Sequence, residues 1–127
     1  MNLNQITVPS RNLEISVPFY QNLGLKLIVS SLPRYARFVC PDGDSTFSIH
    51  RSEELPSGEG IWLYFECEDL EREVERLMSM GLEMEELPND KDWLWREARL
   101  KDPDGHQIIL YYAGKNRKDP PWKLQES

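Results

Sequence analysis

The chain has no long apolar segment. None of its hydrophobic stretches approaches the roughly 20 consecutive apolar residues that a membrane-spanning helix requires. The first residues, MNLNQITVPS, also lack the basic and then apolar pattern of a secretory signal. We therefore expect a cytoplasmic protein with no membrane partner.

Cysteine and histidine are scarce, and basic residues are outnumbered. Two cysteines, Cys40 and Cys67, lie inside strand-like apolar segments without CxxC spacing, which favours buried reduced thiols over a disulfide or a zinc site. Fifteen Lys and Arg face 22 Asp and Glu, a net charge of −7 that repels nucleic-acid phosphates. We expect no nucleic-acid partner. The acidity suits a cationic ligand or serves only solubility.

Residues 96–112 read as a β-hairpin around which the rest of the chain is arranged. Apolar residues alternate on both sides of the turn Asp-Pro-Asp-Gly. Pro103 presets φ for the turn, and Gly105 can take the positive φ that a tight hairpin needs. Residues 35–50 repeat the pattern 62 positions earlier, since Pro41, Asp42 and Gly43 match the second turn. The chain is predicted to be duplicated.

The repeat divides the chain into two β-α-β-β-β modules, about residues 3–55 and 61–113, within one domain of residues 1–127. The first module contains strand-like residues 4–9, a helix over 12–24, a strand over 25–30 and the first hairpin. Pro18 predicts either a short helix capped by Ser16 or a kink. Asp69 caps the second helix and Gly81 ends it.

Residues 89–95 (NDKDWLW) are read as a connection inserted into the second module, because the repeat offset changes from 57 to 62 there. Residues 114–127 form a polar, proline-interrupted tail that is predicted to be neither helix nor strand. Within this tail, Trp122 is a candidate anchor against a surface.

The modules resemble the vicinal oxygen chelate superfamily, which includes glyoxalases, bleomycin-resistance proteins and extradiol dioxygenases. Four segments carry the resemblance: NQITVPSRNLEISVPFYQNLGLKL, YFECEDLEREVERLMSMG, REARLKDPDGHQIIL and NRKDPPW. The resemblance implies an α+β fold in which the strands of both modules form a curled mixed-sheet cup with the helices outside. It does not define one reaction, because the superfamily contains enzymes and binding proteins.

Strand alternation separates two faces. The face predicted to meet the helices is apolar: Ile6, Val8, Ala36, Phe38, Phe47, Ile49, Leu63, Phe65, Ala98, Leu100, Ile108 and Leu110. The other face would line the cup with aromatic, amide, hydroxyl and charged groups. From this face and the inserted connection we take as ligand-binding candidates Gln5, Arg37, Ser48, His50, Trp62, Tyr64, Glu66, Trp95, Arg99 and Tyr111.

Metal-dependent members of the superfamily hold a divalent ion with histidine and carboxylate ligands from the first and last strands of each module. The resemblance places Gln5, Ser48, Trp62 and Ile109 at those positions. Tryptophan and isoleucine cannot bind a metal, and a hydroxyl is a weak ligand for zinc or iron. We therefore expect no metal or other cofactor. A non-standard site built from Gln5, His50 and Glu66 is the alternative.

The preferred hypothesis is metal-free binding or sequestration of a small molecule, similar to the bleomycin-resistance branch. Trp62, Trp93, Trp95 and Tyr64 suit an aromatic or cationic ligand, because aromatic faces stack on planar rings and on cations. The resemblance also implies a homodimer, which would cover exposed sheet edges.

The alternative is an enzyme. It would be a lyase, isomerase or dioxygenase relative with an altered metal site, or a metal-free catalyst. In the metal-free case Glu66 would act as base, and Arg37 or Arg99 would stabilise an oxyanion. A third reading is an oligomeric accessory domain whose cup is plugged by Trp122. Histidine 106 is expected to be solvated in its turn.

Overall fold

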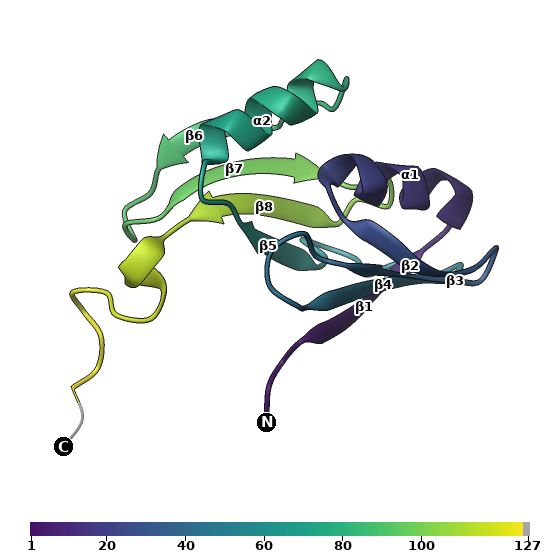
Figure 1. Cartoon of the computed structure of the whole chain (residues 1–127), viewed down its shortest axis with the longest axis horizontal. Helices are drawn as coiled ribbons and strands as arrows, with labels where there is room; N and C mark the ends of the chain where they lie inside the picture. Colours follow the sequence, from purple (N-terminus) through teal and green to yellow (C-terminus); the bar gives the residue numbers. More distant parts are fainter. Residues whose placement is uncertain (126–127) are drawn as a thin grey trace. The chain divides into compact units, whose positions relative to one another are not determined.

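A computed structural model describes residues 1–125, which form two compact units. The first unit contains Met1–Ile61 together with the loop Asp102–His106. Its elements are β1 (Gln5–Ser10), α1 (Leu13–Leu23), β2 (Lys26–Ser31), β3 (Tyr35–Val39) and β4 (Thr46–Arg51) (Figure 1). The sheet has the order β1-β4-β3-β2, with β1 parallel to β4 and the other pairs antiparallel.

The second unit repeats this order of elements. It contains β5 (Trp62–Glu66), α2 (Leu70–Ser79), β6 (Glu86–Asp90), β7 (Arg96–Lys101), β8 (Gln107–Tyr112) and a short 3-10 helix, η1 (Gly114–Arg117). Its sheet has the order β5-β8-β7-β6, with β5 parallel to β8. The predicted α+β class and the duplicated β-α-β-β-β arrangement are confirmed.

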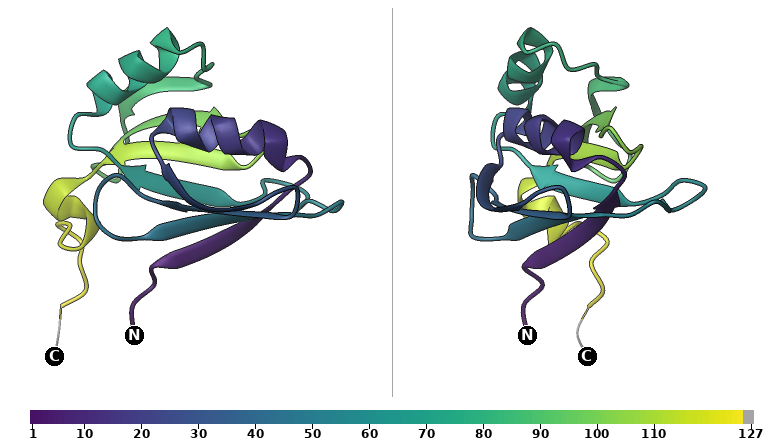
Figure 2. Two further views of the ribbon diagram at one scale, coloured as in Figure 1. Left: turned by 45° about the vertical axis from the view of Figure 1, so that its right-hand side comes forward. Right: turned by 90° about the vertical axis from the view of Figure 1, so that its right-hand side faces the viewer.

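In the first unit, α1 covers one face of the sheet (Figure 2). The Tyr20 ring contacts the rings of Phe38 and Phe47, with centroids 5.9 Å and 4.6 Å away. All three side chains are buried, so they form the centre of this core. The predicted apolar face is correct with one exception. Ile6 lies near the start of the edge strand β1 and is 42% exposed.

In the second unit, α2 lies against β6, β7 and β8 (Figure 1). Its apolar stripe buries Leu70, Val74 and Leu77. On the sheet, the residues of β5, β7 and β8 that were predicted for this face are buried: Leu63, Ala98, Leu100, Ile108 and Leu110. Phe65, at the same face of β5, is half-buried.

Both helices begin at a capping residue. The Asn12 side chain accepts a hydrogen bond from the Glu14 amide, and the predicted cap Asp69 accepts one from the Arg72 amide. The proposed cap at Ser16 is wrong, because α1 continues through Pro18 and the Ser16 hydroxyl is buried in a different hydrogen-bond network. Asn12 caps the helix because its amide side chain lies beside the free N–H groups of the first turn.

Three local predictions are corrected. The supposed connection 89–95 begins inside β6, which pairs with β7 across a register shift and includes Asn89 and Asp90. The tail contains η1, and its last two residues lie outside the described part of the chain. Trp122 is 56% exposed, which argues against a plug.

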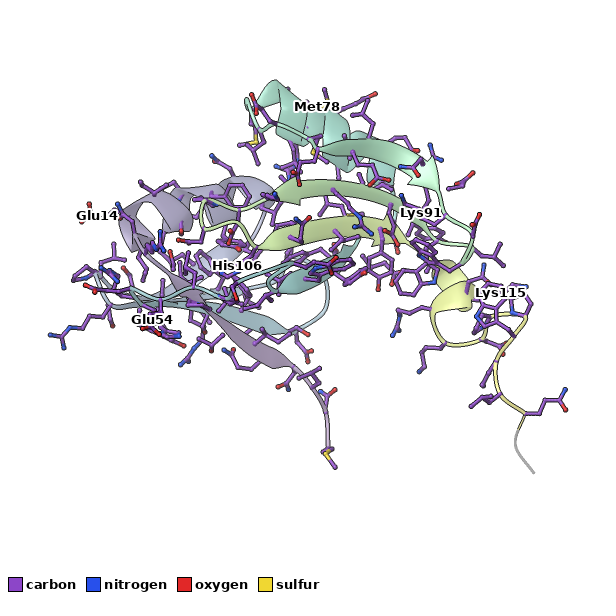
Figure 3. The ribbon with its side chains drawn as sticks, turned by 180° about the vertical axis from the view of Figure 1, so that it is seen from behind. Glu14, Glu54, Met78, Lys91, His106 and Lys115 are labelled. Atoms are coloured by element: carbon purple, nitrogen blue, oxygen red, sulfur yellow. The ribbon has the colours of Figure 1, made fainter. Side chains whose placement is uncertain are left out.

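The loop Asp102–His106 is the largest departure from expectation. His106 is only 2% exposed, and its Nε2 lies 2.8 Å from the carbonyl oxygen of Pro9 (Figure 3). Its backbone N–H donates to Asp102 Oδ1 over 2.8 Å. The expectation of a solvated histidine was therefore wrong, because this hairpin loop packs within the first unit rather than standing in water.

Cys40 and Cys67 form no disulfide among residues 1–125, and both are half-buried rather than buried as predicted. Among residues 1–125, no helix is long and apolar enough to cross a membrane.

Candidate functional site

The first unit presents a polar face on the side of its sheet opposite α1. Strand pairing places Arg37 beside Ser48, and Tyr35 beside His50. On β1, Thr7 pairs with Ser48, and Gln5 lies two residues earlier on the same face. Alternation along three strands therefore gathers the candidates Gln5, Arg37, Ser48 and His50.

A continuous hydrogen-bond network joins Gln5, Arg37 and Ser48 through Tyr35. Gln5 Nε2 donates to Ser48 Oγ over 2.9 Å, and the hydroxyl oxygens of Ser48 and Tyr35 are 2.7 Å apart. Arg37 Nε donates to the Tyr35 hydroxyl over 2.8 Å. Thr46 donates to the Gln5 amide oxygen. Ser48 is fully buried, so its hydroxyl depends on these partners.

Three groups of this face remain accessible, because Arg37 and His50 are exposed and Tyr35 is half-buried. The hydrogen bond with Ser48, assisted by Arg37, holds the pKa of Tyr35 below its usual value. His50 is exposed at the end of β4, and among residues 1–125 its imidazole makes no hydrogen bond or ion pair. This face of the first sheet therefore presents a phenol, a guanidinium and an imidazole.

The second unit presents an aromatic face on the side of its sheet opposite α2. Trp95 and Tyr111 are stacked, with ring centroids 4.6 Å apart and planes 18° apart. Tyr64 stands edge-on to both rings, at 5.9 Å and 5.7 Å. Trp95 Nε1 donates to the carbonyl of Asn116 over 3.2 Å, which fixes the indole. Tyr111 is 6% exposed, whereas Tyr64 is 44% exposed and offers ring surface to a ligand.

A charged group lies beside this aromatic face. The Arg99 guanidinium lies 5.0 Å from the centre of the Trp62 ring, and its Nη2 donates to Glu97 Oε1 over 3.1 Å. Glu97 is fully buried, and its other oxygen accepts from Trp93 Nε1 at 2.7 Å. The Lys91 ammonium contacts the Glu86 carboxylate, which also lies 3.6 Å from Arg99 Nε. These contacts hold Arg99 against Trp62.

Glu66 already has internal partners. Its Oε2 accepts from the Ala113 amide over 3.1 Å, and its Oε1 lies 3.9 Å from Arg117 Nε. One oxygen of this carboxylate is thus occupied by a backbone amide and the other faces a guanidinium, so the role of Glu66 as a general base stays a prediction. The neighbouring phenol of Tyr64 has a raised pKa, through burial and then Glu97, so it stays neutral.

The candidates therefore fall into two groups. Gln5, Arg37 and Ser48 meet in the first sheet, with His50 beside them, and Trp62, Tyr64, Trp95, Arg99 and Tyr111 meet in the second. Sequence reasoning missed Tyr35 and Glu97. Each lies two residues before a chosen arginine on the same strand, so extending the alternation by one step would have found both.

The residues at the superfamily's metal positions do not fit a metal. In the first unit, the Gln5 amide oxygen accepts from Thr46, and its nitrogen donates to Ser48. In the second unit, Trp62 has no ligand atom for a cation and Ile109 is buried and apolar. Among residues 1–125, no three His, Cys, Asp or Glu side chains lie close enough to hold an ion. The alternative set of Gln5, His50 and Glu66 includes an amide ligand and stays a prediction.

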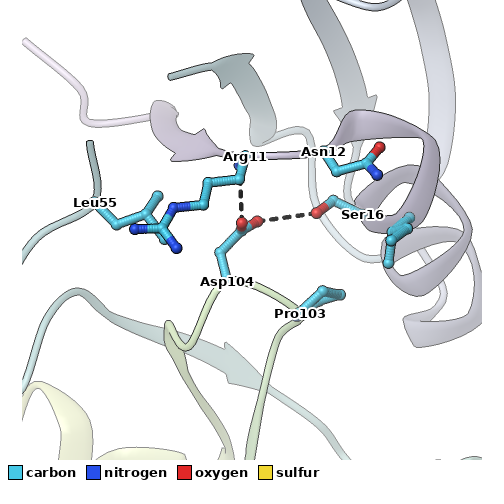
Figure 4. A pocket seen from close by; sticks show the side chains of 7 residues that line it. Arg11, Asn12, Ser16, Leu55, Pro103 and Asp104 are labelled. Carbon is cyan, nitrogen blue, oxygen red and sulfur yellow. Dashed lines mark hydrogen bonds between the residues drawn. The ribbon is translucent and has the colours of Figure 1, made fainter. Parts of the chain in front are cut away.

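A hollow of about 220 Å³ lies elsewhere in the first unit, lined by Arg11, Asn12, Ile15, Ser16, Leu55, Pro103 and Asp104 (Figure 4). It is smaller than usual small-molecule pockets, which enclose about 300–1,000 Å³. Asp104 accepts from the Arg11 amide at 2.8 Å and from the Ser16 hydroxyl at 3.0 Å. Both carboxylate oxygens are thus used to anchor the loop, and we do not place the ligand site here.

Comparison with known proteins identifies the family. The model of the Glyoxalase/Bleomycin resistance protein/Dioxygenase superfamily matches residues 2–110. The chain belongs to this superfamily. A relative, the "Uncharacterized protein YraH" of Bacillus subtilis (strain 168), is 30% identical over 87% of this chain and 98% of its own.

Solved structures support the same fold. A glyoxalase/bleomycin resistance protein/dioxygenase from Nocardioides has a TM-score of 0.79 and 23% identity, covering 98% of this chain and 90% of that one. A bleomycin-binding protein complexed with bleomycin has a TM-score of 0.73 and 18% identity, covering 88% and 98%. These likenesses show the fold.

Proposed function

We propose that this chain binds and sequesters a small planar aromatic molecule on the aromatic face of its second sheet, without a metal. The observation that carries the proposal is the arrangement of Trp62 and Tyr64. These large aromatic side chains are 39% and 44% exposed, yet Arg99 and the Trp95–Tyr111 stack hold their surroundings in place. Ordered, accessible aromatic rings are suited to stacking on a planar ligand.

The charges of this face favour an aromatic ligand over a purely cationic one. The carboxylates of Glu66, Glu86 and Glu97 each have a cationic partner within the chain. A ligand cation would therefore find little free negative charge, although an aromatic face still attracts it. The solved bleomycin-binding neighbour supports small-molecule binding as a use of this fold.

Tryptophan fluorescence tests the proposal, because all four tryptophans lie between residues 62 and 122. The probes are bleomycin, 2-naphthol as a neutral planar ring, acridine orange as a planar cation and tetramethylammonium as a cation without a ring. We expect saturable binding of at least one planar probe and none of tetramethylammonium.

Two alanine variants locate the binding. Trp62→Ala should weaken binding of that planar probe about tenfold, as expected for loss of one stacking contact. Trp122→Ala is the matched control, because Trp122 is exposed in the tail, and it should leave the affinity unchanged. Equal losses in both variants, or no planar probe bound, would reject the aromatic site.

The metal-free part of the proposal has its own test. Protein purified without chelator is analysed by inductively coupled plasma mass spectrometry and then titrated with nickel, zinc, manganese and iron(II) in a thermal-shift assay. A stoichiometric ion or a metal-specific rise in Tm would favour a lyase, isomerase or dioxygenase relative. We expect neither.

We also propose a homodimer. Each sheet leaves two edge strands, β1 and β2 in the first and β5 and β6 in the second, and open edges are commonly covered by a partner. Light scattering coupled to size-exclusion chromatography distinguishes a 14.9 kDa monomer from a particle of twice that mass.

A further inference from the structure

The guanidinium of Arg37 lies on the polar face of the first sheet. Among residues 1–125, no carboxylate lies within ion-pair distance of it, whereas Arg96, Arg99 and Arg117 each have such a partner. Arg37 is exposed, and its Nε donates to the Tyr35 hydroxyl. Its two terminal NH₂ groups therefore remain available to a ligand.

The hydroxyls of Tyr35 and Ser48 leave one hydrogen unused. They contribute two O–H groups but share one oxygen–oxygen contact, of 2.7 Å. Ser48 Oγ already accepts from Gln5 and is fully buried, so an unused hydrogen on Ser48 would be costly. Ser48 must therefore donate to Tyr35. The half-buried phenol then accepts from both Ser48 and Arg37, and its own O–H is free to donate outward.

The neighbouring positions add no negative charge. On β1, β3 and β4 the residues of this face are Gln5, Thr7, Pro9, Tyr35, Arg37, Val39, Thr46, Ser48 and His50. His50 lies beside Tyr35 across the strands, so an imidazole and not a carboxylate occupies that neighbouring position. The surface therefore offers hydrogen-bond donors and positive charge, in a chain whose net charge is −7.

We propose that this face binds an oxyanion, a carboxylate or phosphate group, between the terminal NH₂ groups of Arg37 and the free hydroxyl of Tyr35. A planar guanidinium pairs well with such oxygens, and the phenol adds a directed donor. Gln5 and Ser48 act as positioning residues, because their hydrogen bonds fix which way the Tyr35 hydrogen points. The resemblance places Gln5 and Ser48 at positions that hold a metal in other superfamily members. In this chain they would instead orient the Tyr35 hydroxyl as a hydrogen-bond donor. The site is in the first sheet and does not depend on the aromatic face.

NMR titration of the full chain tests the site directly. Inorganic phosphate and acetate are the probes, at constant ionic strength adjusted with sodium chloride, and the Arg37 Nε–Hε cross-peak is the readout. We expect a saturable shift of this cross-peak with at least one probe. The probe that binds more tightly identifies the oxyanion as phosphate-like or carboxylate-like.

Three variants separate a built site from general charge attraction, with backbone amide shifts of β3 and β4 as their readout. Arg37→Gln should weaken probe binding at least about tenfold, and Tyr35→Phe, which removes only the hydroxyl, about threefold to tenfold. Arg34→Gln is the matched control, since Arg34 is exposed just before β3 and among residues 1–125 has no carboxylate partner. It should leave binding unchanged.

The proposal is overturned if neither probe gives a saturable shift, or if Arg34→Gln weakens binding as much as Arg37→Gln. Unchanged binding in Tyr35→Phe would remove the hydroxyl from the site and overturn the proposed orientation. These outcomes are independent of the proposed aromatic-ligand site in the second sheet. The NMR signals come from the first sheet, and the probes, phosphate and acetate, contain no aromatic ring.

Discussion

The Tyr20 hydroxyl donates a 2.5 Å hydrogen bond to Asp102 Oδ2, and both side chains are buried. The residues are 82 positions apart in the sequence, and the bond ties α1 to the loop Asp102–His106 inside the first unit. Asp102 Oδ1 also accepts from the amides of Asp104 and His106. Burial, and then the Asp102 charge, raises the pKa of Tyr20, which therefore remains a donor at all ordinary pH values.

Tyr20→Phe is expected to lower the free energy of unfolding by about 1.5–3 kcal/mol, because the buried carboxyl of Asp102 loses its side-chain donor. The ring itself is retained, so the contacts with Phe38 and Phe47 should survive. Urea unfolding followed by circular dichroism gives the value. Tyr112→Phe serves as control because Tyr112 is 47% exposed. Equal, small effects in both variants would contradict a structural role for the bond.

Asp102→Asn is expected to change the pH dependence of stability. Burial raises the pKa of Asp102 above the ordinary value of 3.8, although the Tyr20 bond opposes this. The folded state then holds the proton more tightly than the unfolded state, so this carboxyl's contribution to stability falls as pH rises through that window. The amide cannot ionise. The stability of Asp102→Asn relative to the wild type should therefore increase with pH above about 3.8.

Chemical denaturation at several pH values between 3.5 and 7.5 measures this difference. Asp42→Asn provides the control. Asp42 is an exposed aspartate in the first hairpin loop, which the internal repeat relates to the loop Asp102–His106. Its stability relative to wild type should vary much less with pH. The pKa of Asp102 would not be raised if the free energy of unfolding of Asp102→Asn, relative to that of the wild type, stayed constant or fell with rising pH.

The fold was predictable from sequence because the duplication supplies each signal twice. Alternation located strands around Phe38, Phe47, Ala98 and Leu100, and the turns at Gly43 and Gly105 have the positive φ that was expected, 75° and 88°. Strand β6 was harder, because Pro88 and a register shift against β7 remove the regular alternation of apolar and polar residues.

The candidate sites were predictable only as far as strand periodicity reaches. Periodicity placed Arg37 with Ser48 and Trp62 with Arg99. It could not show that His106 would be buried, because that depends on where a hairpin loop packs rather than on its own sequence. Nor could it show that Glu97 is fully buried, because its partner Trp93 comes from a turn whose course is set by tertiary structure.

Asp104→Ala is expected to reduce the free energy of unfolding by about 1.5–3 kcal/mol. The carboxylate accepts from the Arg11 amide and the Ser16 hydroxyl near the start of α1, so its loss frees two donors (Figure 4). The internal repeat offers a matched control in Asp42→Ala. Asp42 corresponds to Asp104 at the offset of 62 but is exposed, and its removal should cost no more than about 0.5 kcal/mol. Similar losses in the two variants would refute the anchoring role.

Glu97→Ala is expected to destabilise the second unit by about 2 kcal/mol, because both Arg99 and the Trp93 indole lose an acceptor. Glu97→Gln keeps one acceptor oxygen but turns an amide N–H toward a donor, so an intermediate loss is expected. Urea unfolding followed by tryptophan fluorescence measures both. Glu75→Ala, on the exposed side of α2, is the control and should have little effect. If Glu97→Ala behaves like Glu75→Ala, the buried carboxylate is not holding Arg99 in place.

Leu94→Gly is expected to stabilise the chain, which is unusual for loss of a leucine. Leu94 lies in the turn between β6 and β7 with φ of 66°, and its side chain is 48% exposed. A branched residue in left-handed backbone costs about 1–2 kcal/mol, whereas glycine avoids that strain but loses more entropy on folding. The net gain should be about 0.5–1 kcal/mol in urea unfolding. Leu87→Gly is the control. Leu87 is also exposed but lies in strand β6 and has no left-handed backbone to relieve, so glycine there should destabilise the chain. A loss in Leu94→Gly as large as that in Leu87→Gly would mean that the Leu94 side chain contributes packing that outweighs the backbone strain.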